Sequence, residues 1–409
     1  MTTRLIPLLI GGLMFMSSVS SSPSHNHTQA GTSQGTRCQF PSLQCAKAPS
    51  AAFDPHGRLW VVWAFGGHVY LHYSDNLGQS YSPPVAVNRE PETISARGEN
   101  RPKIAFDRHQ GIYLSWTRSA SKRYSGHIRF SHSDDGGESF SSPITVNDHL
   151  EDVGHRFDAL RVTPQGDVYI AWIDKRDRHA RQAAGEKYAG AALYYAWRPA
   201  GETRFRPNLK VADHSCECCR LGMALDVDQK PVIVWRHIFG DNIRDHALTR
   251  FTAHETFTPP QRATYDGWKI AACPHHGPDL RVENGVYHLA WFSDSPTAQG
   301  LFYAQSADQG QHFSSPYPFG KVNHRASRPQ VLAIGNTVYL AWKTFDGQQH
   351  QIRQQRSIDG GQQWQAVQVV AEAEGQVDYP QLLTHQNQPY LFWFTKKHGF
   401  LLHNIGVNP

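Results

Sequence analysis

The segment HSCECCRLG, residues 214–222, contains three cysteines within four positions. A fourth cysteine follows in the segment ACPHHGP, with two histidines close behind it. Thiolate and imidazole groups are good ligands for soft and borderline ions, above all Cu(I) and Zn(II). If the fold brings the two segments together, they predict a metal site held by Cys216, Cys218, Cys219, Cys273, His275 and His276.

Disulfide bonds are the alternative for these cysteines, because four thiols could form two bridges. Cys218 and Cys219 are adjacent in the chain and cannot join each other without a strained ring. Three thiols are crowded into one segment, and Cys273 is the one further partner near them in the chain. We therefore expect a metal site. Copper is favoured because the chain is rich in histidine, with 24 residues, and is expected outside the cytoplasm; zinc is the alternative.

The N-terminus has the pattern of a cleavable secretory signal, expected over residues 1–22. Arg4 precedes an apolar run from Leu5 to Met16, and small residues follow. This run is short for a transmembrane helix, and no second run of spanning length follows it, so no transmembrane span is expected. Residues 23–36 are expected to be a flexible linker. The mature protein is then periplasmic or secreted, in a compartment where disulfides form.

Composition restricts the kind of partner. The chain has 409 residues and a net charge of +5, and its basic residues are mixed with acidic ones. A nucleic-acid-binding protein would gather its basic residues on one face or along one helix, so nucleic acid is not expected as a partner. We expect a monomer whose partner is a metal ion or a small anionic ligand.

Tryptophan recurs at the end of short apolar runs, with spacings from 51 to 63 residues. Runs such as LWVVW and VYLAW are rich in Val, Tyr and Trp, as buried β-strands are. Such a period indicates a repeat of one sheet, and an all-β fold. The seven runs end at Trp63, Trp116, Trp172, Trp235, Trp291, Trp342 and Trp393.

A second motif shares the period and combines Ser, Asp or Asn, Gly and an aromatic residue at fixed offsets. It occurs as SDNLGQSY, SDDGGESF, SADQGQHF and SIDGGQQW, beginning at Ser74, Ser133, Ser306 and Ser357. These residues suit a hairpin turn, because Asp or Asn accepts backbone hydrogen bonds and Gly takes a positive φ. The four turns resemble the Asp boxes, or BNR repeats, of the sialidase superfamily, over about residues 46 to 406. The resemblance implies a β-propeller of four-stranded antiparallel blades.

The number of blades follows from the tryptophans. The resemblance implies six blades, as in the family's enzymes, whereas the tryptophan pattern has seven members. We predict a single seven-bladed β-propeller over residues 37–409, with six blades as the alternative. The last repeat shows three strands, so the segment RCQFPSL, residues 37–43, is predicted to add an outer strand and close the ring. A disulfide between Cys38 and Cys45 would then staple this strand.

When the repeats are aligned on their tryptophans, four arginines and a tyrosine fall at the start of the innermost strands. These are Arg101, Arg156, Arg220, Arg328 and Tyr379. Equivalent positions of a propeller lie on one ring, so these side chains would converge at one mouth of the channel. Guanidinium groups present paired donors to carboxylate or phosphate, which predicts an anion site. The two cysteine segments precede the inner strands of the fourth and fifth blades and are expected at the same mouth.

The resemblance implies a catalytic role for this ring. In sialidases an arginine triad holds the substrate carboxylate and a tyrosine is the nucleophile, so Tyr379 resembles the nucleophile and the arginines resemble the triad. The chain departs from that pattern, because KAPSAAFD in the first blade lacks the arginine and no segment matches the catalytic aspartate. As the alternative, the arginines pair with Asp107, Asp158 or Glu99 and fill the channel.

Three function classes follow from the sequence. The first is an extracytoplasmic copper-binding propeller. The second is an exo-sialidase-like glycoside hydrolase, and the third is a non-catalytic propeller that binds a glycan or a protein. If the protein is an enzyme, it is a sialidase-like hydrolase or a copper-dependent enzyme. The charged insertion at residues 173–187 is expected to be a solvated loop or a lid over the mouth.

Overall fold

The tryptophan-terminated runs form central strands, as the sequence predicts. In a computed structural model of the chain, which describes residues 1–2 and 38–406, each of the seven tryptophans lies in the second strand of its own sheet. All seven indole side chains are fully buried. Strands that are covered on both faces read as nearly continuous apolar runs, which explains the composition of these segments.

The first four sheets span residues 47–262 and are antiparallel throughout. They consist of β1 (Lys47–Phe53), β2 (Leu59–Phe65), β3 (His68–Ser74) and β4 (Val85–Ala86); β5 (Lys103–Phe106), β6 (Ile112–Ser119), β7 (Gly126–Ser133) and β8 (Ile144–Thr145); β9 (His155–Val162), β10 (Val168–Asp174), β11 (Ala191–Arg198) and β12 (Leu209–Ser215); and β13 (Gly222–Leu225), β14 (Pro231–Arg236), β15 (His246–Ala253), β16 (Thr256–Phe257) and β17 (Gln261–Arg262).

The last three sheets span residues 279–404. They consist of β18 (Asp279–Glu283), β19 (Val286–Ser295), β20 (Ala298–Ser306) and β21 (Tyr317–Gly320); β22 (Ser327–Ile334), β23 (Thr337–Phe345), β24 (His350–Ser357) and β25 (Gln368–Ala373); and β26 (Gln381–His385), β27 (Gln388–Thr395) and β28 (Gly399–Asn404). The short helices are η1 (Leu43–Cys45), α1 (Arg176–Ala183) and η2 (Val322–His324).

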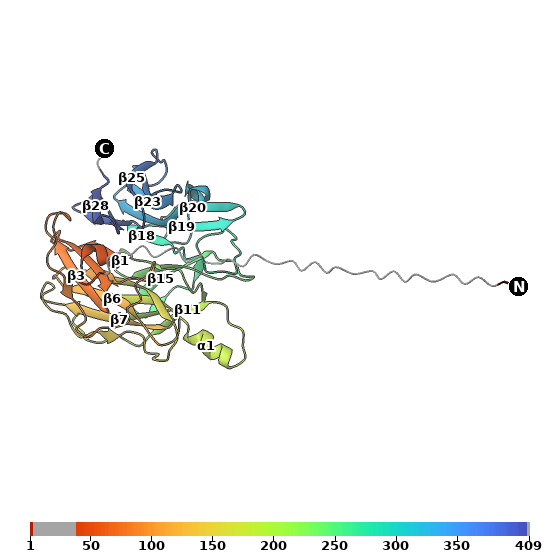
Figure 1. The fold of residues 1–409 in the computed structure, drawn as a ribbon, viewed down its shortest axis with the longest axis horizontal. Helices are drawn as coiled ribbons and strands as arrows, with labels where there is room; N and C mark the ends of the chain where they lie inside the picture. The colour runs from red at the N-terminus through yellow and green to blue at the C-terminus, as the bar shows by residue number, and fades with distance from the viewer. Residues whose placement is uncertain (3–37, 407–409) are drawn as a thin grey trace. The chain divides into compact units, whose positions relative to one another are not determined.

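The seven sheets form a ring. The first strand of each sheet contacts the first strands of the two neighbouring sheets, and β26 contacts β1 to complete the circle. In Figure 1 the orange strands of the first sheet lie beside the blue β28 of the last, and side chains of the two blades share an apolar cluster. The seven first strands line a central channel of about 490 Å³. The fold is a seven-bladed β-propeller, as predicted, and the six-bladed alternative is wrong.

Apolar contacts between neighbouring blades form the core. The described residues contain seven clusters of buried hydrophobic side chains, and each cluster joins two adjacent blades. Trp172, for example, packs with Phe130 between the second and third blades. Trp235 packs in the next interface, together with the side chains of the CECC segment. The cysteines therefore lie at the edge of an apolar interface, where water is excluded.

The four Ser/Asp/Gly turns share one hydrogen-bonding pattern and connect the third strand of a blade to the segment leading into the fourth. In the second blade the Gly137 N–H donates to Ser133 Oγ at 2.9 Å, and the Ser139 N–H donates to Asp135 Oδ1 at 3.0 Å. Gly137 has a φ of 92°, a conformation that glycine adopts at low cost because it has no Cβ atom. The turns that begin at Ser74, Ser306 and Ser357 repeat these bonds.

The predicted closing strand is the part of the architecture that the described residues do not bear out. Residues 38–43 form no strand, and the last blade has three strands. Pro41 has no backbone donor for a strand ladder, and the Cys45 N–H donates to Ser42 O at 3.0 Å to form the turn of η1. Leu43 of η1 packs into the apolar cluster between the last and first blades, so a short helix contacts β28 instead.

Three further predictions concern the ends and the insertion. All of the predicted linker and all but the first two residues of the predicted signal peptide fall in residues 3–37, outside the described residues, and residues 40–406 form one compact unit. The insertion at 173–187 contains the helix α1, none of whose residues is buried. None of the helices in the described part of the chain is long and apolar enough to cross a bilayer.

Candidate functional site

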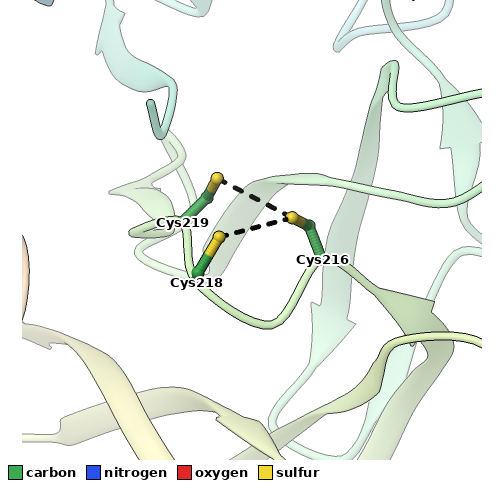
Figure 2. Close-up of side chains that lie close together, drawn as sticks. All are labelled: Cys216, Cys218 and Cys219. Carbon is green, nitrogen blue, oxygen red and sulfur yellow. Dashed lines mark hydrogen bonds between the residues drawn. The ribbon is translucent and has the colours of Figure 1, made fainter. Parts of the chain in front are cut away.

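The turn between β12 and β13 holds three cysteines whose side chains point toward one another (Figure 2). The Sγ atom of Cys216 lies 3.8 Å from that of Cys218 and 3.9 Å from that of Cys219. All three sulfur atoms lie within 4.8 Å of one another. Their exposed fractions are 1%, 4% and 2%. We refer to Cys216, Cys218 and Cys219 as the cysteine cluster.

Positive charge surrounds Cys216. Arg244 donates from Nη1 to Cys216 Sγ at 3.3 Å, and the guanidinium of the buried Arg236 lies close by. Hydrogen bonds from Cys218 and Cys219 lower the pKa of Cys216; burial opposes this effect, and the two arginines add to it. Hydrogen bonds with Cys216 and Cys219 raise the pKa of Cys218, and burial raises the pKa of Cys219. Of the three thiols, Cys216 is therefore the one whose pKa is shifted toward the thiolate form.

The sulfur spacing fits a metal ion. With a metal–thiolate distance of about 2.3 Å, three sulfur ligands lie roughly 4.0 Å apart in a trigonal site and roughly 3.8 Å apart in a tetrahedral one. The Cys216–Cys218 and Cys216–Cys219 sulfur separations of 3.8 and 3.9 Å fall within this interval. Two of the three sulfur separations thus match ligand spacing, and the third is within 4.8 Å. Among the described residues, they are also the one group of three or more His, Cys, Asp or Glu residues with such spacing.

The other three predicted ligands lie outside the cysteine cluster. Cys273 is exposed, and all four cysteines of the two segments are free thiols. The His275 ring hydrogen-bonds through Nδ1 to the Cys218 carbonyl at 3.1 Å, so its other nitrogen faces away from that contact. His276 stacks on Phe292 with a centroid distance of 4.0 Å, and burial lowers the pKa of this histidine to about 3. Cys38 and Cys45 are not among the free thiols, and their pairing stays a prediction.

A pocket of about 540 Å³ opens beside the cysteine cluster. Cys218 is the one cluster residue on its wall, and Cys273 and His275 lie on the same wall. Glu99 lines both this pocket and the central channel, so the pocket lies at one end of the channel. We refer to it as the Cys218 pocket.

Glu99 organises the predicted arginine ring. Its carboxylate lies 2.5 Å from Arg328 Nη1 and 3.3 Å from Arg220 Nη1. It also accepts the backbone N–H groups of Arg220 at 3.1 Å and Gly277 at 3.2 Å. Burial acts to raise the pKa of Glu99, but the charges of Arg328 and Arg220 outweigh it and hold the pKa below its ordinary value. Two of the four predicted anion-binding arginines thus share one carboxylate of the protein itself.

Arg101 has a different partner. Its Nη2 lies 2.7 Å from Asp378 Oδ1, and its Nη1 donates to the Pro49 carbonyl at 2.9 Å. The guanidinium groups of Arg101 and Arg328 lie 4.2 and 4.6 Å from the ring centroid of Tyr379. The Tyr379 hydroxyl is buried near these groups without a well-formed hydrogen bond to a described residue. Burial raises the pKa of Tyr379, and both arginines oppose that shift.

Arg156 alone of the four arginines has no acidic partner among the described residues. Its guanidinium lies over the rings of Phe157 and Tyr124, at 5.0 and 5.6 Å from their centroids, and it lines the Cys218 pocket. The alternative that the arginines pair with acidic groups therefore describes three of them. Glu99 is the partner that the sequence suggested, whereas Asp107 bonds to Tyr113 Oη at 2.7 Å instead.

Two acidic residues near the arginines differ from the sequence-based prediction: Asp158 was expected to pair with an arginine, and Asp378 was not predicted. Asp158 is buried on the channel wall, 2.6 Å from Ser115 Oγ and 3.8 Å from Lys103 Nζ, and pairs with none of the four arginines. Asp378 directly precedes Tyr379 in the chain and was missed. An acid next to an aligned ring position is the signal that could have found it.

Comparison with known proteins gives the fold. No protein-family model and no curated protein matches the sequence. The solved structure of a PL25 polysaccharide lyase, an ulvan lyase, is 9% identical with a TM-score of 0.55, covering 88% of this chain and 94% of that one. The polysaccharide lyase Uly1 is 11% identical with a TM-score of 0.54, covering 92% and 94%. The Hadza microbial sialidase Hz136 is 14% identical with a TM-score of 0.49, covering 83% and 74%. At such identities the likeness is one of fold.

Proposed function

We propose that this protein is an extracytoplasmic β-propeller that binds Cu(I) through Cys216, Cys218 and Cys219, with Zn(II) as the alternative ion. The observation that carries the proposal is the placement of three buried sulfur atoms within 4.8 Å of one another. Soft thiolate ligands select Cu(I). Structural zinc sites use four protein ligands, and no fourth His, Cys, Asp or Glu among the described residues completes this group.

The charges around the cluster also suit a copper thiolate complex. Three thiolates and Cu(I) carry a net charge of about −2, which is costly to bury unless cations lie nearby. Arg244 and Arg236 supply positive charge at Cys216, and the Arg328 guanidinium interacts electrostatically with Cys219. When bound, the ion would be a soft electrophilic centre at the mouth of the channel. The protein's own groups would position the sulfur ligands, exclude water and balance their charge.

Anaerobic titration of the reduced protein with Cu(I), in competition with a Cu(I) chelator, tests the proposal. We expect one ion per chain and a sulfur-to-copper charge-transfer band. Cys218→Ser should weaken binding by more than the roughly 10–100-fold that is typical for a group one step removed from a metal. Cys273→Ser is the matched control, because Cys273 is exposed and lies outside the cysteine cluster; it should keep the affinity of the wild type.

The result that overturns the proposal is equal affinity of the wild type and a Cys218→Ser, Cys219→Ser double variant. Thiol counting on protein purified from the periplasm gives a second check, because four titratable thiols per chain are expected. Two disulfides among Cys216, Cys218, Cys219 and Cys273 would also overturn it.

A second candidate function is hydrolysis or binding of an anionic glycan by a member of the sialidase superfamily. It is favoured by Tyr379 between Arg101 and Arg328, and by the four Ser/Asp/Gly turns. Three of the four arginines are already paired, however, so we expect weak or absent cleavage of a simple sialoside. If cleavage is measured, and Tyr379→Phe abolishes it while Cys218→Ser does not, the hydrolase replaces the copper protein as the best assignment.

A further inference from the structure

The wall of the Cys218 pocket carries more positive than negative charge. Its two acids are already occupied: Glu99 pairs with Arg328 and Arg220, and Glu217 pairs with Lys175 at 2.5 Å and with Arg178. Two cations of the wall keep no acidic partner among the described residues. They are Arg97, at the exposed rim, and Arg156 on β9.

Of these two cations, Arg156 is the better candidate for binding an anionic ligand. Its guanidinium makes no hydrogen bond or ion pair with a described residue and is flanked by the rings of Phe157 and Tyr124. The residue is only half-buried, so a ligand can reach it through the pocket. A guanidinium that is partly removed from water and lacks a partner binds a carboxylate strongly, because it offers two parallel N–H donors.

The pocket also reaches the cysteine cluster. Cys218 is on the wall, whereas Cys216 and Cys219 do not line the pocket. The exposed thiol of Cys273 lines the same pocket. A volume of about 540 Å³ accommodates a ligand of small-peptide size. A ligand in this pocket would therefore touch a cation and a cluster thiol at the same time.

We infer that the Cys218 pocket receives Cu(I) from a small carrier that bears both a thiolate and a carboxylate. This inference rests on the proposed copper function. The carboxylate binds Arg156, which brings the carrier's copper to Cys218. A copper–sulfur bond to Cys218 Sγ then forms as the bond to the carrier sulfur breaks. The Cys218 thiol proton passes to the released carrier thiolate, and the copper stays Cu(I) throughout, so no oxidant or reductant is needed.

The experiment compares two copper donors under anaerobic conditions, Cu(I)–glutathione and Cu(I)–glutathione diethyl ester. The two share the thiol but differ in their carboxylates. The half-saturating donor concentration for copper transfer is measured by stopped-flow absorbance of the charge-transfer band. For the wild type it should be about 10-fold lower, or more, with glutathione than with the ester, since one charge-assisted hydrogen-bonded pair has an effect of that size.

The ratio between the two donors isolates the carboxylate contact. In Arg156→Gln the ratio should fall to near 1, whereas Arg89→Gln, a charge removal at an exposed arginine outside the pocket, should keep the wild-type ratio. Binding of copper-free glutathione, followed by ligand NMR, gives a readout without metal; it should be present in the wild type and lost in Arg156→Gln.

The outcomes separate the two claims. If the wild type takes Cu(I) from both donors with a ratio near 1, or if Arg156→Gln keeps the wild-type ratio, the carrier inference is wrong and the copper function stands. If the wild type takes Cu(I) from neither donor, the copper function fails and the inference fails with it.

Discussion

Replacing Glu99 by glutamine should destabilise the propeller more than any other single removal of charge at the channel mouth. The Glu99 side chain is 2% exposed and holds two guanidinium groups and two backbone N–H groups, which come from Arg220, Arg328 and Gly277. Glutamine has the same shape but lacks the charge, and one end of its amide is a donor. Arg220 and Arg328 would then face each other without a counter-ion.

The size of the effect follows from the exposure of the two arginines. Breaking a fully buried ion pair typically costs about 3–5 kcal/mol. The side chains of Arg220 and Arg328 are 15% and 18% exposed, so water at the mouth can solvate them in part. We therefore expect the lower end of the range, a loss of about 3 kcal/mol in unfolding free energy at pH 7.

Urea unfolding, followed by tryptophan fluorescence, measures this loss, with Glu90→Gln as a matched control at an exposed glutamate without an ion pair among the described residues. The control should stay within about 0.5 kcal/mol of the wild type.

Because the pKa of Glu99 is lowered in the folded state, its contribution is fully present above the ordinary pKa of 4.5 and is lost as the pH falls below that value. The difference in unfolding free energy between the wild type and Glu99→Gln should therefore shrink at acidic pH. A difference in unfolding free energy under 1 kcal/mol at pH 7, or a difference that grows at acidic pH, would refute the reasoning.

Three further predictions concern the core and the turns. Trp172→Ala should cost about 3–5 kcal/mol in unfolding free energy by calorimetry, because the indole is fully buried between two blades. Gly361→Ala should cost about 1–3 kcal/mol more than Gly375→Ala in urea unfolding: both glycines have positive φ, but only at Gly361 would the new methyl meet Tyr303 Oη, at 2.6 Å. Burial, with help from neighbouring acid, raises the pKa of Asp266 to about 6, so Asp266→Asn should gain stability relative to wild type as the pH rises from 4 to 7; a constant difference across that range would contradict the shift.

The fold was predictable because its signal repeats. Each blade needs one fully buried second strand, and a tryptophan at its end recurs wherever two blades pack together. The hydrogen-bonding residues of the four turns are adjacent in the chain, so their pattern can also be recognised locally. The closing segment was predicted wrongly because the repeat ends there. The preference of Pro41 for irregular backbone and the packing of Leu43 replaced the pattern of the other blades.

The site was predictable only in part. Alignment on the tryptophans placed four arginines and Tyr379 near one end of the channel, where contacts with Glu99, Asp378 and the Cys218 pocket now link them. Alignment could not give the direction of side chains in the connecting loops. His275 has a left-handed φ of 53°, and the ring of His276 turns onto Phe292, so neither joins the cysteine cluster. Loop conformation of this kind depends on contacts from several blades at once.

The meeting of the first and last blades has a mechanical consequence. At the other six blade interfaces, a peptide segment joins the two sheets, so the backbone itself shares any load. Between the last and first blades the ring is held by side-chain packing, to which Leu43 and Phe400 contribute, and by hydrogen bonds of the Gln381 side chain to the backbone of β1. A pulling force applied between residues 40 and 406 therefore loads this seam first. The same property makes the ring suitable for circular permutation, because a linker across the seam would join segments that are already in contact.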